Sequence, residues 1–153
     1  MKSGPLARAR SLSEPGHVAF SAETPVAFVT GAAQGIGRAC AERLARDGFI
    51  VHALDRHAET LERAVSDMRA QGLKVVAHTA DVCVRQQVAS AFDSVNRVDA
   101  LVCAAGVYSD ASIETLTEEE FRRVLDVNVI GTFIPAQEAL DRKSTRLNSS
   151  HAN

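Results

Sequence analysis

The sequence predicts an α/β fold built on a doubly wound parallel sheet. Short apolar runs alternate with helical patterns between residues 25 and 140, as right-handed βαβ units require. A glycine-rich turn joins the first apolar run to the first helical pattern, and 153 residues suffice for one domain with a single core. We expect the chain to contain strands one to four of this sheet, with the fold truncated after the fifth helical region.

The first strand is predicted over residues 26–29, a continuous apolar run that suits a strand buried on both faces. A helix follows the turn and ends at Gly48. Its expected buried stripe consists of Ile36, Ala39, Cys40 and Leu44.

The second to fourth strands are predicted over residues 49–54, 74–79 and 100–103. Between them we expect a helix over residues 58–71, closed by Gly72, and a shorter helix over residues 87–95. The longer helix carries its apolar residues at helical spacing, at Leu61, Ala64, Val65 and Met68.

The last predicted helix begins with Thr117 as its N-cap. Glu120 completes a capping box, and Leu116 and Phe121 can form a hydrophobic staple. Asn128 falls within the apolar stripe, where an unpaired buried amide would cost on the order of a few kcal/mol, so we expect hydrogen-bond partners for it. The stripe runs through Phe121, Val124, Leu125, Thr132 and Phe133.

The two ends of the chain lack these patterns. Residues 1–24 hold Pro, Gly, Ser and scattered Arg, which predicts a disordered extension or a start codon assigned too early. After Leu140 we expect helical periodicity to stop, because residues 141–153 are almost entirely polar. Residues 141–151 resemble an in-frame translation of a common sequencing adapter. Our hypothesis is that this tail is an artefact, and the alternative is a natural polar tail. A nucleotide sequence whose codons depart from the adapter would refute the artefact hypothesis.

The composition excludes several classes of function. A formal net charge of −2 gives no electrostatic basis for binding nucleic acid or an anionic membrane surface. The sequence has no run of 18 or more apolar residues that could span a membrane. The spacing of Cys40, Cys83 and Cys103 fits neither a disulfide framework nor a zinc site, so we expect reduced thiols, no metal and a cytoplasmic protein.

Residues 30–37, Thr-Gly-Ala-Ala-Gln-Gly-Ile-Gly, are the strongest candidate for a ligand site. Gly31 allows a tight turn, Gly35 allows the close approach of a pyrophosphate, and Gly37 allows a helix to pack closely on a strand. Gln34 and Ile36 belong to the same candidate site, where the helix N-terminus offers free N–H groups to phosphates. A purely structural turn would explain the glycines alone, but their place between a strand and a helix favours a dinucleotide site.

Asp55 ends the second predicted strand, where its carboxylate can accept both hydroxyls of an adenosine ribose and repel a 2′-phosphate. Gln34 is neutral, whereas Arg56 could bind a 2′-phosphate. On balance these residues favour NAD over NADP as the cofactor. An aspartate that merely ends a strand is the structural alternative.

Two further segments follow strands. Asp81 and Val82 come after the third strand and are placed to contact adenine. The small residues after the fourth strand allow the backbone to pass close to a ribose; they are Cys103, Ala104, Ala105 and Gly106. Asn128 is the last candidate, with a core amide satisfied by backbone atoms as its structural alternative.

Together these features resemble the short-chain dehydrogenase/reductase (SDR) family over residues 25–140. The T-G-x-x-x-G-x-G spacing matches the main branch of that family, whereas the extended branch has T-G-x-x-G-x-x-G. The N-N-A-G element of the family corresponds to residues 103–106, where Cys103 and Ala104 replace the asparagines that usually brace the central strand. Asn128 looks like the helix asparagine of the family, which holds a water in the proton relay to the active-site lysine.

The resemblance implies a Rossmann-like sheet in the strand order 3-2-1-4, whose fourth strand would be an unpaired edge that favours aggregation. It implies an NAD(P)-dependent dehydrogenase or reductase that transfers hydride between the cofactor and an alcohol or ketone. A full-length parent would form a homo-oligomer, often through the helix that bears Asn128 and the next one.

The family's catalytic serine and Tyr-x-x-x-Lys pair are absent. Tyr108, the single tyrosine, is followed four residues later by Ser112, and the three lysines, Lys2, Lys74 and Lys143, cannot serve. These groups normally lie beyond the point where this chain ends. Without the proton donor we expect the chain by itself to be inactive.

Two other interpretations stay open. One is a non-catalytic binding or regulatory protein that uses the dinucleotide fold as a sensor, and the other is a lyase, epimerase or dehalogenase on the same scaffold. Serine with Tyr-x-x-x-Lys in the rest of the gene would favour the oxidoreductase. The sequence does not choose a substrate, and ketoacyl reduction, dihydrodiol oxidation and sugar alcohol oxidation are all compatible with it.

Overall fold

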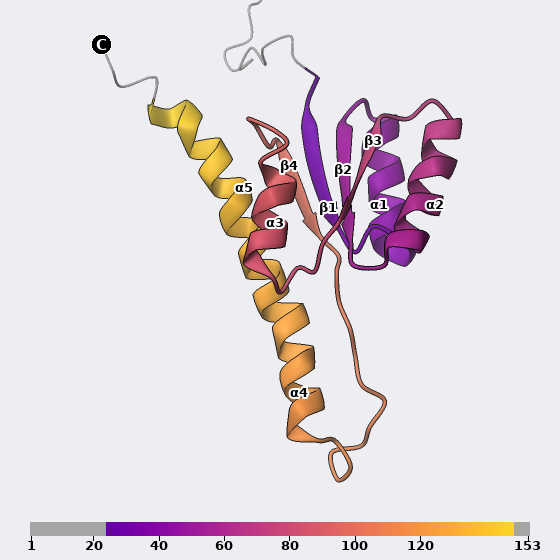
Figure 1. Ribbon diagram of the computed structural model, residues 1–153, viewed down its shortest axis with the longest axis vertical. Helices are drawn as coiled ribbons and strands as arrows, with labels where there is room; N and C mark the ends of the chain where they lie inside the picture. The colour runs from indigo at the N-terminus through magenta and orange to yellow at the C-terminus, as the bar shows by residue number, and fades with distance from the viewer. Residues whose placement is uncertain (1–23, 149–153) are drawn as a thin grey trace, which may run out of the picture.

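The computed structural model describes residues 24–148, which form a parallel four-stranded sheet in the order β3-β2-β1-β4 (Figure 1). The strands are β1 (Val26–Thr30), β2 (Ile50–Asp55), β3 (Val75–Thr79) and β4 (Ala100–Cys103). The predicted fold class and strand order are therefore confirmed. Thr30 at the end of β1 pairs with Leu54 on one side and with Cys103 on the other, so the carboxyl ends of the strands share one edge.

Helices cover both faces of the sheet (Figure 1). One face is covered by α1 (Gly35–Arg46) and α2 (Ala58–Ala70), and the other by α3 (Arg85–Phe92) and α5 (Gly131–Asn148). The alternation of side chains along β1 serves both layers, because Ala27 and Val29 pack toward α1 and α2 while Phe28 packs toward α3. None of the helices within residues 24–148 is both long and apolar enough to cross a membrane.

The buried face of α1 differs from the predicted stripe. Gly37, Ala41 and Ala45 are the buried residues of this helix, whereas Ile36 is 79% exposed and Ala39 is also exposed. Small residues were underweighted because apolar periodicity scores large side chains. A helix that packs closely on a parallel sheet instead needs small ones at the contact.

The last helical region is divided into three parts. A π-helical turn, η1 (Asp126–Ile130), separates α4 (Glu118–Leu125) from α5, and the N–H of Gly131 donates to the carbonyl of Asp126. Thr117 caps α4 as predicted, since its Oγ1 accepts from the N–H of Glu120 at 3.2 Å.

The expected burial of the apolar stripe on this helical region is wrong for the chain as described. Phe121 is 50% exposed, and Leu125, Thr132 and Phe133 are exposed as well. The reason is that α4 extends beyond the carboxyl ends of the strands (Figure 1), so the sheet does not cover it. On α5 the buried side chains are Ile134, Pro135 and Ala139 instead.

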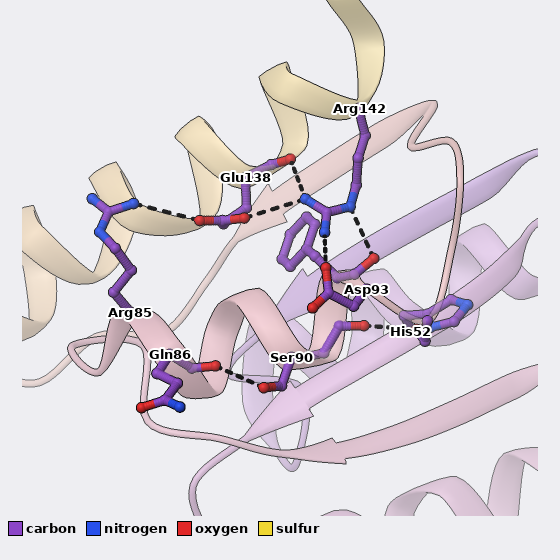
Figure 2. Close-up of polar contacts among 10 residues, drawn as sticks. His52, Arg85, Gln86, Ser90, Asp93, Glu138 and Arg142 are labelled. Atoms are coloured by element: carbon purple, nitrogen blue, oxygen red, sulfur yellow. Dashed lines mark hydrogen bonds and ion pairs between the residues drawn. The ribbon is translucent and has the colours of Figure 1, made fainter. Parts of the chain in front are cut away.

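Helical backbone continues past Leu140 to Asn148, contrary to the expectation that it stops. Figure 2 shows one reason, the Arg142 guanidinium held between α5 and α3. It donates to Asp93 Oδ1 at 2.7 Å and to Glu138 Oε2 at 3.2 Å, and its carbon lies 5.5 Å from the centre of the Phe92 ring. The predictions for residues 1–23 and 149–153 concern segments outside the described residues.

Candidate functional site

A pocket of about 620 Å³ opens at the edge where the strands end. Its volume falls within the range of small-molecule sites. Apart from Cys103, every residue that the sequence assigned to a cofactor lines this pocket. Those residues are Gly31, Gln34, Gly35, Ile36, Gly37, Asp55, Asp81, Val82, Ala104, Ala105 and Gly106.

Two glycines of the turn are required by backbone packing. A Cβ on Gly37 would overlap the carbonyl group of Gly31, because the first turn of α1 rests on the end of β1. A Cβ on Gly31 would lie 2.7 Å from the N atom of Ala105, and Gly31 has a φ of 66°, which favours glycine. The turn therefore lies directly against the backbone of the loop that follows β4.

The N-terminus of α1 faces the pocket without a side-chain cap. Gln34 occupies the N-cap position, its side chain makes no capping hydrogen bond, and the first turn carries no acidic residue. Gly35, Ile36 and Gly37 supply the first N–H groups of the helix and line the pocket. Uncapped N–H groups together with the helix dipole favour an anionic ligand at this position.

Asp55 is fixed at the end of β2 by three hydrogen bonds. Its Oδ1 accepts from the backbone N–H of His57 at 3.0 Å and lies 3.2 Å from His57 Nδ1, while Oδ2 accepts from the N–H of Ala33 at 3.2 Å. The Asp55 side chain is only 10% exposed. These contacts hold the carboxylate beside the glycine turn, and the next side chain, Arg56, also lines the pocket.

The loop after β3 forms the wall opposite α1. Asp81 Oδ1 accepts from the N–H of Cys83 at 2.8 Å, which closes a short turn. Val82 is buried against α5, where a Cβ on Gly131 would lie only 2.5 Å from Val82 Cγ2. Burial and the neighbouring Asp81 raise the pKa of the Cys83 thiol, so this thiol is a poor nucleophile.

The loop after β4 is braced by Thr30 and Asn128. The N–H of Ala105 donates to the fully buried Thr30 Oγ1 at 3.2 Å. Asn128 Oδ1 accepts from the N–H of Val107 and Asn128 Nδ2 donates to the Val107 carbonyl, both at 2.9 Å. The expected hydrogen-bond partners of Asn128 are thus found, but on this loop, and the Asn128 residue is exposed rather than buried.

Cys103 lies next to the pocket but does not line it. Its Sγ contacts the carbonyl of Thr132 on α5 at 3.9 Å, and burial raises the pKa of the thiol. None of the three cysteines, Cys40, Cys83 and Cys103, is paired in a disulfide in the part of the chain that the structure describes. Among the described residues no group of three or more His, Cys, Asp or Glu is arranged to hold a metal ion.

Five lining residues were missed from the sequence: His57, Ala80, Val107, Tyr108 and Val127. Ala80, Val107 and Val127 directly adjoin a predicted site residue, and His57 and Tyr108 lie two positions from one, so extending each predicted segment by two positions would have found all five. Val127 precedes Asn128 on η1, which lies beside the loop after β4.

Comparison with known proteins supports the geometry. Residues 25–147 match the profile of the family described as short chain dehydrogenase. An uncharacterized oxidoreductase of Methylorubrum extorquens is 42% identical over 123 residues, which cover 76% of this chain and 49% of that protein.

Solved structures give the same picture. A short chain dehydrogenase from Mycobacterium paratuberculosis bound to NAD aligns with a TM-score of 0.73 at 30% identity, covering 77% of this chain and 50% of that one. An alcohol dehydrogenase from Thermococcus sibiricus complexed with 5-hydroxy-NADP aligns with a TM-score of 0.72 at 34% identity, covering 78% and 53%. The chain thus spans about half the length of the relatives it matches.

Proposed function

This chain belongs to the short-chain dehydrogenase family, and we propose that its pocket binds NAD for an oxidoreductase that interconverts an alcohol and a ketone. One observation carries the proposal: the uncapped N-terminus of α1 and the Asp55 carboxylate face the same pocket at the carboxyl edge of the sheet. That pairing of an anion site with a hydroxyl acceptor matches a pyrophosphate joined to a ribose.

The residues present fit a dinucleotide. The N–H groups of Gly35 to Gly37 would hold the pyrophosphate, and Gly35 has open space around the position of a Cβ. Asp55 would accept from the adenosine ribose, and Asp81 with Val82 would contact adenine. The small residues Ala104 to Gly106 would leave room for the second ribose. When bound, the nicotinamide supplies or accepts the hydride.

We propose NAD rather than NADP as the preferred cofactor. The Asp55 carboxylate would repel a 2′-phosphate, and Gln34 in the glycine turn brings no positive charge. The structural relatives are described with either NAD or 5-hydroxy-NADP, so the family itself leaves the choice to such local residues.

Residues 25–140 would then be the dinucleotide-binding part of a longer cytoplasmic protein that forms a homo-oligomer. The catalytic serine and Tyr-x-x-x-Lys pair would lie in the half of the relatives' length that this chain does not span. Asn128 holds the loop after β4 through Val107, and we propose that it also holds a water of the proton relay.

The test is a titration of NADH into the intact product of the gene that encodes this chain. Asp55→Asn removes the charge, and we expect it to weaken NADH binding about tenfold because a charge-assisted hydrogen bond is lost. Gly35→Leu should weaken NADH binding at least as much. Asp67→Asn is the matched control, since Asp67 lies exposed on α2.

The proposal is wrong if neither Asp55→Asn nor Gly35→Leu weakens NADH binding relative to the control. A protein that binds NADH but oxidises no alcohol and reduces no ketone would instead favour the non-catalytic, regulatory function. Turnover without net redox change would favour a lyase or epimerase.

A further inference from the structure

Asp55 has less free acceptor capacity than a residue that grips two ribose hydroxyls requires. An ionised carboxylate offers about four lone-pair positions, two on each oxygen. Oδ1 already faces two nitrogen atoms of His57, the backbone N at 3.0 Å and Nδ1 at 3.2 Å. Oδ2 already accepts from the N–H of Ala33 at 3.2 Å. One position therefore remains for two hydroxyl groups.

The contacts of Asp55 differ in how readily they break. The N–H groups of Ala33 and of the His57 backbone belong to the chain itself and stay in place when a ligand arrives. The His57 side chain is 62% exposed, and Asp55 is the polar partner of its ring within the described part of the chain. Rotation of the His57 imidazole about its χ angles therefore frees a second acceptor position on Asp55.

Arg56, the residue between them, carries an uncommitted positive charge. It lines the pocket, and among the described residues its guanidinium forms no hydrogen bond or ion pair, although its charge acts on the nearby Cys83 thiol. A 2′-phosphate beside Asp55 would add about two negative charges to the carboxylate. When the His57 imidazole donates to Asp55, the Arg56 guanidinium beside them can donate hydrogen bonds to that phosphate.

We propose that His57 is a specificity-determining residue that sets the choice between NAD and NADP. In the resting site its imidazole occupies the Asp55 oxygen that a ribose hydroxyl needs, which weakens NAD binding. The imidazole also masks the carboxylate from a 2′-phosphate, which Arg56 then holds. The chain therefore takes both cofactors, with a smaller preference for NAD than Asp55 alone would give. This inference rests on the dinucleotide site proposed above.

The experiment measures the dissociation constants of NADH and NADPH by calorimetry for the intact gene product and matched variants. His57→Phe keeps a planar ring of similar size but has no N–H donor, whereas His57→Gln keeps a donor. We expect His57→Phe to tighten NADH binding about fivefold and to weaken NADPH binding, and His57→Gln to stay close to the wild type. Arg56→Ala should weaken NADPH binding about tenfold and shift the ratio of the two constants toward NADH.

The outcomes separate this inference from the function on which it rests. If the wild type binds NADH but His57→Phe leaves the ratio of the two constants within about twofold, or if Phe and Gln shift it alike, the role of His57 is overturned. If the wild type binds neither NADH nor NADPH, the proposed function fails first. Arg63→Ala, an exposed change on α2, should alter neither constant. Thermal unfolding of each variant confirms that the fold is kept.

Discussion

Acidification should destabilise the protein through a buried histidine on β2, His52, and its half-buried partner on β3, His78. His52 is 5% exposed, and its Nδ1 lies 2.8 Å from His78 Nε2 and 3.3 Å from Ser94 Oγ. Ser94 donates its own proton to the carbonyl of Ala91 at 2.6 Å. The contact between His52 Nδ1 and His78 Nε2 is a hydrogen bond only while one of the two nitrogen atoms carries a proton and the other accepts it. Protonating the acceptor nitrogen would place two donors face to face.

The magnitude follows from the pKa of His52. Burial, with the neighbouring His78 as a smaller cause, lowers this pKa from 6.5 to about 4. Burial lowers the pKa of His78 as well. Because the folded state resists protonation, stability is full above pH 6.5 and falls as the pH drops from 6.5 toward 4. At pH 4.5 the loss due to His52 is about 2–3 kcal/mol, a large share of the roughly 5–15 kcal/mol of a typical domain.

Urea unfolding followed by circular dichroism at pH 7.5 and pH 4.5 measures this loss. His52→Phe keeps a ring in the stack with Phe28, whose centroid lies 4.7 Å away, but cannot be protonated. We expect the wild type to lose about 2–3 kcal/mol more than His52→Phe between the two pH values. Ala39→Ser, a change at an exposed residue of α1, should keep the wild-type dependence. Equal losses in the wild type and His52→Phe, or a His52 ring that NMR finds charged at pH 5.5, would refute the reasoning.

Three further changes test the architecture of the site. Gly37→Ala should lower the free energy of unfolding by about 3 kcal/mol, because the added Cβ would overlap the Gly31 carbonyl. The control Ala39→Ser, on the exposed side of α1, should cost less than about 0.5 kcal/mol, and urea unfolding measures both values. Asn128→Ala should cost about 1–2 kcal/mol and speed hydrogen exchange at the Val107 amide, whereas an unchanged exchange rate would mean that the two 2.9 Å bonds do not hold the loop. The 153-residue chain should turn over no alcohol with NAD, in contrast to the intact gene product, and measurable dehydrogenase activity of the short chain would contradict the placement of the catalytic groups outside it.

The sheet was predictable because each of its strands is a local apolar run. Val26 to Val29 and Ala100 to Cys103 are short segments bounded by turn residues, and a strand buried on both faces needs little more. The strand order came from the family resemblance, since no local pattern states which strands are neighbours. Helix boundaries were predicted less accurately, because the end residues of a helix depend on capping contacts. The helix predicted over residues 87–95, for example, is α3 at Arg85–Phe92.

Burial of the helices was predicted less well, because periodicity shows that a face is apolar without showing what covers it. The stripe at Phe121 and Leu125 is a clear pattern, yet in this chain the sheet ends before it reaches α4. The predicted stripe of α1 is half right, since Cys40 and Leu44 pack against the core while Ile36 and Ala39 are exposed. The fully buried residues, Gly37, Ala41 and Ala45, were missed because they carry little apolar weight.

The sequence by itself determined the fold class and most of the residues that line the pocket, because parallel strands bring the residues after each strand to a common edge. Only the tertiary structure decided how those residues are engaged. The hydrogen bonds between Asn128 and Val107 depend on the π-helical turn and on the close approach of Gly131 to Val82. The hydrogen bonds that Asp55 accepts from Ala33 and His57 depend on how the glycine turn meets the end of β2. Hydrogen bonds between loops distant in sequence are set by packing in three dimensions, which no local period records.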